Sequence, residues 1–102
     1  RYPPGGGRGV AHPLVRASAW GLDKDYGKEA DERCLILCQI ETASAIEELD
    51  AILQVDGVDG IFVGPLDLSA SLGHFGDPAH EVVTDALSRI EIIAGKHPNK
   101  IL

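Results

Sequence analysis

The chain has 102 residues, and its 44% hydrophobic and 25% charged residues form the composition of an ordinary globular protein. A formal net charge of −7, few aromatic residues and no cluster of Lys or Arg exclude the basic surface that nucleic-acid binding requires. No apolar run approaches the roughly 20 residues needed to cross a bilayer, so no membrane partner is expected.

The ends and the cysteines of the chain bear on its origin. The chain begins with Arg1 and ends with Leu102 in an apolar stretch, so we expect residues 1–102 to be an internal segment of one domain, truncated at both ends. Cys34 and Cys38 are four positions apart, about 13 Å on a strand, which is too far for a disulfide. Unpaired thiols are typical of a reducing compartment, and we expect a cytoplasmic protein.

The first part of the chain contains one expected helix and one expected strand. Residues 1–10 are rich in Pro and Gly, which interrupt both kinds of regular structure. A helix is expected from about Asp25 to Glu32. The apolar run from Cys34 to Ile40 has the length of a strand and predicts a parallel strand that is covered on both faces.

A helix is expected over 43–54, because Thr42 can cap its first turn. Its apolar residues recur at helical spacing, namely Ile46, Leu49, Ile52 and Leu53. Gly57 suits the left-handed conformation that ends many helices. The run from Val58 to Val63 predicts a second buried strand.

The last third of the chain continues the alternation. A loop rich in Gly and Ser is expected from Gly64 to about Asp77, and Pro78 can open a helix that closes near Gly95. Its apolar stripe comprises Val83, Ala86, Leu87, Ile90 and Ile93. Residues 100–102 predict the start of a third strand. This order predicts an α/β fold with parallel strands and right-handed crossover helices, as in doubly wound sheets and eight-stranded barrels.

Two carboxylates, Glu41 and Asp67, each follow a predicted strand, at the sheet edge where both of these folds place their chemistry. Neighbouring strands lie ~4.8 Å apart, so the two acids can share one divalent cation, and such hard oxygen ligands suit magnesium or manganese rather than zinc. Gln39 leaves the strand on the same face as Glu41. The residues alone leave open a second reading, in which Glu41 and Asp67 only cap helices.

Other motifs give weaker indications. The run from Gly5 to Gly9 lacks the preceding strand and the lysine of a phosphate-binding loop. The four histidines show no zinc spacing with the cysteines. Ser69 and Ser71 do not form a nucleophile elbow, so the sequence gives no support to hydrolase chemistry.

Several motifs resemble, in order, those of the metal-dependent pyruvate aldolases of the HpcH/HpaI type, over nearly the whole chain. They are Arg1-Tyr2-Pro3-Pro4, Arg8-Gly9, Arg16-Ala17-Ser18, Asp25-Tyr26, Gln39-Ile40-Glu41-Thr42 and the long run from Gly57 to His74. The resemblance implies a partial (β/α)8 TIM barrel within a single barrel domain, assembled as a homo-oligomer, usually a hexamer. It also implies cleavage of 4-hydroxy-2-oxo acids to pyruvate and an aldehyde.

By the same resemblance, Glu41 and Asp67 are metal ligands for Mg²⁺ or Mn²⁺, with Co²⁺ as a further candidate. Gln39 contacts the substrate, and the backbone amides of Leu66 and Asp67 hold the pyruvate carboxylate. The family's base histidine and its arginine lie upstream of this segment, so no catalytic residue is expected within the chain. Leu66 stands where a small residue is common, and Asp31 where the family often has Asn.

Two alternatives to the pyruvate aldolase stay open. One is an enzyme of the citrate-lyase-β or malyl-coenzyme-A-lyase branch, which would bind a coenzyme A ester. The other is a truncated, non-catalytic relative that acts as a binding module. The resemblance implies, in either case, that residues 1–102 alone lack aldolase activity.

Overall fold

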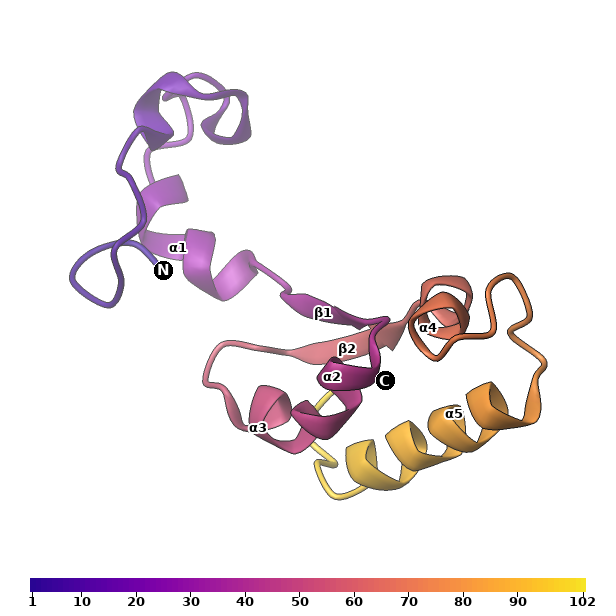
Figure 1. Ribbon diagram of the computed structural model, residues 1–102. Helices are drawn as coiled ribbons and strands as arrows, with labels where there is room; N and C mark the ends of the chain where they lie inside the picture. The colour runs from indigo at the N-terminus through magenta and orange to yellow at the C-terminus, as the bar shows by residue number, and fades with distance from the viewer. The chain divides into compact units, whose positions relative to one another are not determined.

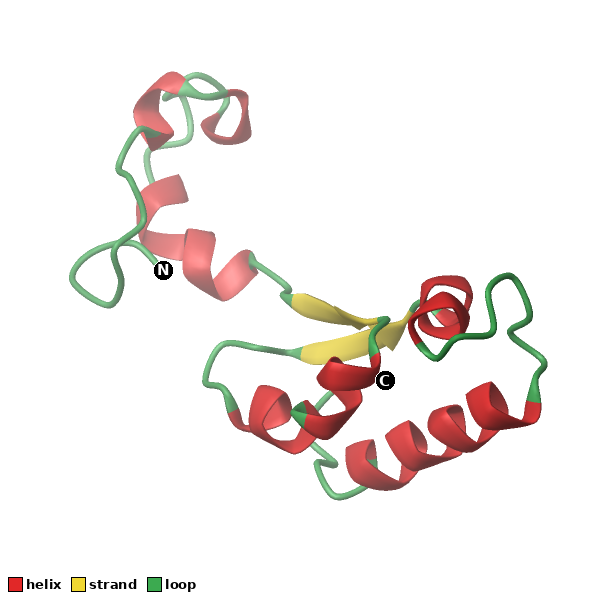
Figure 2. Cartoon of the chain, viewed as in Figure 1, coloured by secondary structure: helices red, strands yellow, loops and turns green.

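The computed structural model describes all residues from 1 to 102, which form two compact units, Arg1–Cys34 and Leu35–Leu102 (Figure 1). The second unit carries the strands and most of the helices (Figure 2). No helix of the structure combines the length and the hydrophobicity needed to span a membrane.

The first unit contains two short 3-10 helices, η1 (His12–Leu14) and η2 (Arg16–Ser18), and one α-helix, α1 (Tyr26–Arg33). Residues 1–10 form no helix or strand, as predicted from their Pro and Gly content, and α1 confirms the helix expected near 25–32. Ser18 is fully buried, and its hydroxyl donates to the carbonyls of His12 and Val15. The buried hydroxyl therefore links η1 to η2.

The sheet of the second unit consists of the parallel strands β1 (Leu37–Ile40) and β2 (Gly60–Val63), in a register that runs from Leu37 opposite Gly60 to Ile40 opposite Val63. Both strands begin later than predicted. Ile101 forms a parallel bridge to Gly60, so β2 is paired on both edges at this point. The predicted third strand is thus present as a single bridge, and the strands lie side by side in chain order.

Only one face of this sheet is covered by helices. Ile40 and Ile61 are 1% exposed and belong to the core, whereas Leu37 is 37% and Phe62 46% exposed on the opposite face. The prediction that the first strand is covered on both faces is wrong for this structure. The reason is that every helix that packs against the sheet does so through the core face.

The helix expected over 43–54 is split into α2 (Ala43–Glu47) and α3 (Leu49–Gln54). The break is at Glu48, whose φ of −93° and ψ of 4° end one helix and begin the next. Thr42 caps α2 as predicted, because its hydroxyl accepts from the amide of Ala45 at 3.1 Å. Gly57 has a φ of 90°, which confirms the left-handed turn after α3.

A short helix, α4 (Pro65–Ser71), replaces the first half of the loop expected from Gly64 to Asp77, so that prediction is wrong for these residues. Pro65 occupies the first helical position, where its fixed φ is already helical. The amide of Leu68 then donates to the Gly64 carbonyl at 2.9 Å, and the Leu68 side chain is fully buried. Burial of one apolar side chain therefore favours helix over loop.

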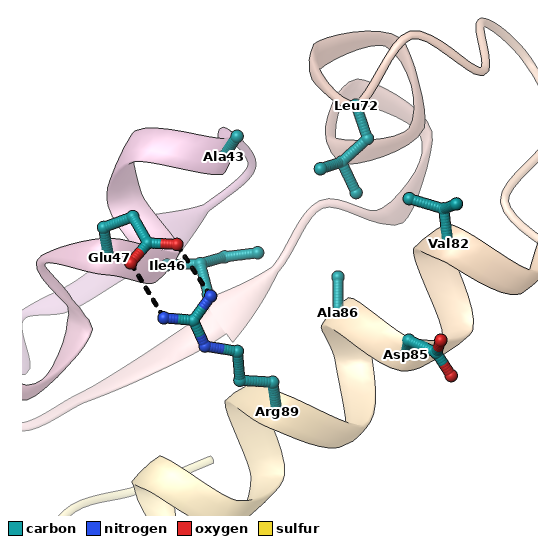
Figure 3. Close-up of a pocket in the computed structure, with 8 residues that line it drawn as sticks. All are labelled: Ala43, Ile46, Glu47, Leu72, Val82, Asp85, Ala86 and Arg89. Atoms are coloured by element: carbon teal, nitrogen blue, oxygen red, sulfur yellow. Dashed lines mark hydrogen bonds and ion pairs between the residues drawn. The ribbon is translucent and has the colours of Figure 1, made fainter.

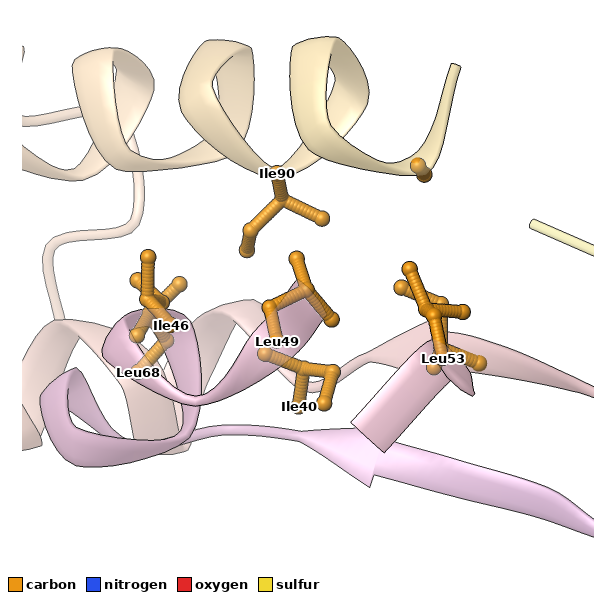
Figure 4. Packing of buried hydrophobic residues seen from close by; sticks show 8 residues of the cluster. Ile40, Ile46, Leu49, Leu53, Leu68 and Ile90 are labelled. Atoms are coloured by element: carbon orange, nitrogen blue, oxygen red, sulfur yellow. The ribbon is translucent and has the colours of Figure 1, made fainter. Parts of the chain in front are cut away.

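Helix α5 (Glu81–Ala94) begins three residues after Pro78, because His80 is its cap and accepts from the Val82 amide through Nδ1. The predicted apolar stripe is confirmed, and it completes the core between the sheet and the helices (Figure 4). In Figure 4, Ile90 points from α5 toward Leu49 of α3, with Ile40 of β1 beneath. The buried core comprises Ile40, Ile46, Leu49, Leu53, Ile61, Leu68, Ile90 and Ala94.

Candidate metal and substrate site

Glu41 lies directly after β1, at the carboxyl end of the sheet. Strand pairing sets Ile40 opposite Val63, and the amide of Gly64 donates to the Ile40 carbonyl at 3.0 Å. The residues that follow the two strands, Glu41 and Gly64, therefore lie side by side.

Gln39 and Glu41 converge on the space that Gly64 leaves empty. A Cβ atom added to Gly64 would lie 2.6 Å from Gln39 Nε2, and 3.2 Å from both Cβ and Oε2 of Glu41. The structure thus brings the predicted amide and carboxylate together, one residue beyond β2. Only a glycine accommodates both side chains in this arrangement.

Leu66 and Asp67 lie in the first turn of α4, and both are exposed. This corrects the expectation that Asp67 ends a strand: β2 stops at Val63, and the helix begins at Pro65. A carboxylate in a first helical turn is stabilised by the helix dipole, but it is not the cap here, since Gly64 occupies that position without a side-chain cap bond.

The reading of Glu41 as a helix cap fails on similar grounds. The cap of α2 is Thr42, whose hydroxyl takes the first-turn amide of Ala45. Glu41 is half-buried beside Gln39 without this capping role. Neither Glu41 nor Asp67 therefore caps a helix, which was the alternative that the sequence left open.

The backbone amides of Leu66 and Asp67 precede the first intrahelical bond of α4, which Leu68 makes to Gly64. Amides in this position have no partner within a helix, and they are the groups that bind anions at helix N-termini. The buried hydroxyl of Ser69 donates to the Leu66 carbonyl at 2.7 Å and holds this turn in shape. A carboxylate of a small acid is the kind of ligand that fits such amides.

The residues described so far provide oxygen donors from Glu41 and Asp67 and an amide from Gln39. Two carboxylates with open positions for water and substrate suit a hard divalent cation. The space over Gly64 holds Gln39 and Glu41, while Asp67 lies in the first turn of α4. No group of three or more His, Cys, Asp or Glu side chains in the structure is placed to hold a metal ion.

Sequence reasoning missed the residues that support this site. The sequence predicts a loop at Gly64, although the position of Gly64 directly after a strand and beside an expected ligand is a signal for a supporting role. The hydroxyl of Ser71, which forms no nucleophile elbow, accepts from the Ala43 amide at 3.0 Å. That bond depends on α4, which the sequence did not predict.

A separate cavity of about 260 Å³ lies between α2, α4 and α5 (Figure 3). It is lined by Ala43, Ile46, Glu47, Leu72, Val82, Asp85, Ala86 and Arg89, so none of the predicted site residues borders it. At its side, the Arg89 guanidinium donates to both oxygens of Glu47, at 2.7 and 2.8 Å. These hydrogen bonds and the charge of Arg89 lower the pKa of Glu47, which marks a structural ion pair between α2 and α5.

Comparison with known proteins decides the family. The HpcH/HpaI aldolase/citrate lyase family model matches residues 1–101. The chain belongs to this family. It is 47% identical to a 4-hydroxy-2-oxo-heptane-1,7-dioate aldolase of Klebsiella pneumoniae, covering 100% of this chain and 40% of that protein. It is 51% identical to a 4-hydroxy-2-oxovalerate aldolase of Rhodococcus jostii, covering 96% of this chain and 38% of that protein.

A solved family member has the same fold over this segment. The crystal structure of an HpcH/HpaI aldolase/citrate lyase family protein from Burkholderia cenocepacia matches with a TM-score of 0.84 and 41% identity, covering 92% of this chain and 36% of that one. The 102-residue chain spans about two fifths of the length of the curated relatives it matches.

Proposed function

We propose that the chain is an internal segment of a metal-dependent pyruvate aldolase, which reversibly cleaves 4-hydroxy-2-oxo acids to pyruvate and an aldehyde. The observation that carries the proposal is the convergence of Gln39 and Glu41 on Gly64, just before the helix whose first turn holds Asp67. The names of the relatives support the same reaction class.

The fold part of the proposal is a (β/α)8 barrel of which this chain supplies consecutive strands. Parallel strands in chain order, with helices on one face only, are the arrangement that a barrel wall requires. The exposed face, with Leu37, Gln39 and Phe62, would then line the barrel interior. A full barrel takes ~250 residues, which agrees with the two fifths of its relatives that the chain spans.

Glu41 and Asp67 would hold the cation, which we propose to be Mg²⁺ or Mn²⁺, with Co²⁺ as a further candidate. When bound, the cation supplies a positive charge that favours the enolate over the neutral ketone, and this differential stabilisation is what catalysis requires. The amides of Leu66 and Asp67 would donate to the carboxylate of pyruvate. Gln39 would hold the substrate beside Glu41.

The remaining chemistry is expected outside residues 1–102. By family resemblance, the base that moves the proton and the arginine that stabilises charge lie upstream, and no residue of this chain takes their place. We further propose a cytoplasmic homo-oligomer, a hexamer by the same resemblance, that acts on a small 2-oxo acid and on neither nucleic acid nor membrane.

The test is a coupled assay of pyruvate release by the full-length protein that contains this chain, with and without a chelator. Glu41→Gln and Asp67→Asn should each weaken Mn²⁺ binding and lower turnover by about a hundredfold or more, because each removes a charged ligand. Matched controls are Glu91→Gln and Asp85→Asn, which change exposed acids of α5 and should leave both values unchanged.

The outcomes separate the alternatives. Turnover at the unchanged rate in Glu41→Gln or Asp67→Asn would remove that residue from the site. Binding of a coenzyme A ester without pyruvate release would favour the citrate-lyase-β or malyl-coenzyme-A-lyase branch. A full-length protein that neither binds Mn²⁺ nor turns over would favour the non-catalytic binding module.

A further inference from the structure

The two proposed metal ligands come from segments that the chain does not join directly. Glu41 precedes α2, and Asp67 lies in α4, with α2, α3 and β2 between them in sequence. The distance between two such carboxylates decides how well they bind one ion, so a contact that joins the two segments acts on the site. The structure contains such a contact away from the sheet.

That contact is a hydrogen bond from the backbone amide of Ala43 to the hydroxyl of Ser71, at 3.0 Å. Ala43 is the first residue of α2, two positions after Glu41, and an amide there has no partner within its own helix. Thr42 takes the amide of Ala45 instead. The first turn of α2 is therefore held by two hydroxyls, one of its own and one from α4.

The position of Ser71 within α4 relates this hydrogen bond to Asp67. Ser71 follows Asp67 by four residues, about one helical turn, so both side chains leave the same face of the helix. The face of α4 that carries Asp67 is thus the face that meets the segment after Glu41. Leu68, on another face, is fully buried in the core and anchors the helix there.

We infer that Ser71 is a positioning residue, whose bond to the Ala43 amide sets the separation of the Glu41 and Asp67 carboxylates and thereby the affinity for the divalent cation. The inference rests on the proposed function, since it assumes that these two acids bind the ion. A hydrogen bond between exposed groups adds little to folding stability. Removal of this bond should therefore change the metal affinity of the site and leave the free energy of unfolding nearly unchanged.

The experiment compares three variants of the full-length protein: Ser71→Ala, Ser71→Thr and Ser88→Ala. Ser71→Thr keeps the hydroxyl, and Ser88→Ala is the matched control, because Ser88 donates to the Thr84 carbonyl within α5 and touches neither ligand segment. The measurements are the Mn²⁺ dissociation constant by titration calorimetry, thermal unfolding without metal, and pyruvate release at rising Mn²⁺ concentration.

Ser71→Ala should weaken Mn²⁺ binding about tenfold, as expected for a group that supports metal ligands. Its turnover should approach the unchanged rate at high Mn²⁺, and its metal-free unfolding temperature should match that of Ser88→Ala. Ser71→Thr and Ser88→Ala should bind Mn²⁺ within about twofold of the unchanged protein.

Three results would overturn the inference while leaving the proposed function standing. They are Mn²⁺ affinity in Ser71→Ala equal to that in Ser88→Ala, equal loss in Ser71→Ala and Ser71→Thr, and a loss of metal-free stability without a change of affinity. Failure of the unchanged protein to bind Mn²⁺, or binding that survives Glu41→Gln, would instead overturn the proposed function and the inference with it.

Discussion

Gly64 contributes to the site because it has no side chain, which leaves room for Gln39 and Glu41. An added Cβ would lie 2.6 Å from Gln39 Nε2, the mobile end of a long side chain, and 3.2 Å from Glu41 Cβ, which is close to the backbone. Gln39 can swing away at little cost in folding energy, but it then leaves the site. The φ of Gly64 is −101°, which any residue adopts, so the contact and not backbone strain decides the effect.

Gly64→Ala should therefore impair function more than stability. We expect the KM for the 2-oxo acid to rise about tenfold or more in the full-length protein. The reason is that the added Cβ displaces Gln39, and a small displacement of a group that positions the substrate is costly. Thermal unfolding should change little. Gly9→Ala is the matched control, since nothing lies within 4 Å of a Cβ added there. An unchanged KM in Gly64→Ala would show that the convergence on Gly64 does not matter for substrate binding.

One ion pair and one hydrogen bond link the segments around the helices that cover the sheet. Glu47 of α2 binds Arg89 of α5, and Asp50 of α3 binds His97, just beyond α5, at 2.8 Å. The hydrogen bonds of Arg89 lower the pKa of Glu47, and the hydrogen bond of His97 lowers that of Asp50. Both carboxylates therefore resist protonation in the folded chain, Glu47 through Arg89 of α5 and Asp50 through His97. Each contact stabilises the fold less as the pH falls and the carboxylate is protonated.

The sign of the pH effect follows from the lowered pKa of Glu47. The folded chain resists protonation of this group more than the unfolded chain does, so the pair stabilises above the usual pKa of 4.5 and loses its effect as the pH falls. Urea unfolding of the metal-free protein should show Glu47→Gln less stable than the unchanged protein at pH 7, with the gap closing as the pH falls below 4.5.

The control for this prediction is Glu91→Gln, an exposed acid on α5. It should unfold like the unchanged protein at pH 7 and below pH 4.5. A gap between Glu47→Gln and the unchanged protein that stays constant as the pH falls from 7 to below 4.5 would contradict an origin in the charge of Glu47.

Periodicity predicted the elements whose burial has a regular pattern, and missed those fixed by single contacts. The apolar stripe of α5 is visible in sequence because the helix buries one repeating side, and β1 and β2 are visible because each lies within a continuous apolar run. Helix α4 is not visible in the sequence because its glycine, proline and serines favour a loop, while its one buried apolar side chain, Leu68, favours the helix. The break at Glu48 has no signal in the apolar spacing, which continues across it.

The same distinction holds for the site. The convergence of Gln39 and Glu41 could be predicted, because a strand fixes which side chains share a face and where they emerge. The placement of Asp67 could not, since it depends on where β2 stops and α4 begins. The bond between Ser71 and Ala43 is further still from sequence, because it joins residues 28 positions apart through a helix that was not predicted.

At the scale of the whole molecule, the uncovered face of the sheet determines how residues 35–102 behave alone. Leu37, Phe62 and Ile101 are 37, 46 and 50% exposed, and the outer edge of β1 has no partner strand. Apolar faces and open edges of this kind favour association with other chains. We therefore expect the isolated 102-residue chain to self-associate and to release no pyruvate.

Phe62 separates this expectation from general stickiness. In the isolated chain, Phe62→Ser should reduce self-association measured by sedimentation, because it removes the largest apolar side chain of the open face. Phe75→Ser is the control: Phe75 is 90% exposed but lies in the loop between α4 and α5. In the full-length protein, Phe62→Ser should instead cost about 3–5 kcal/mol of stability, since the proposed barrel would bury this ring. Equal effects of the two substitutions in both settings would place Phe62 outside any barrel interior.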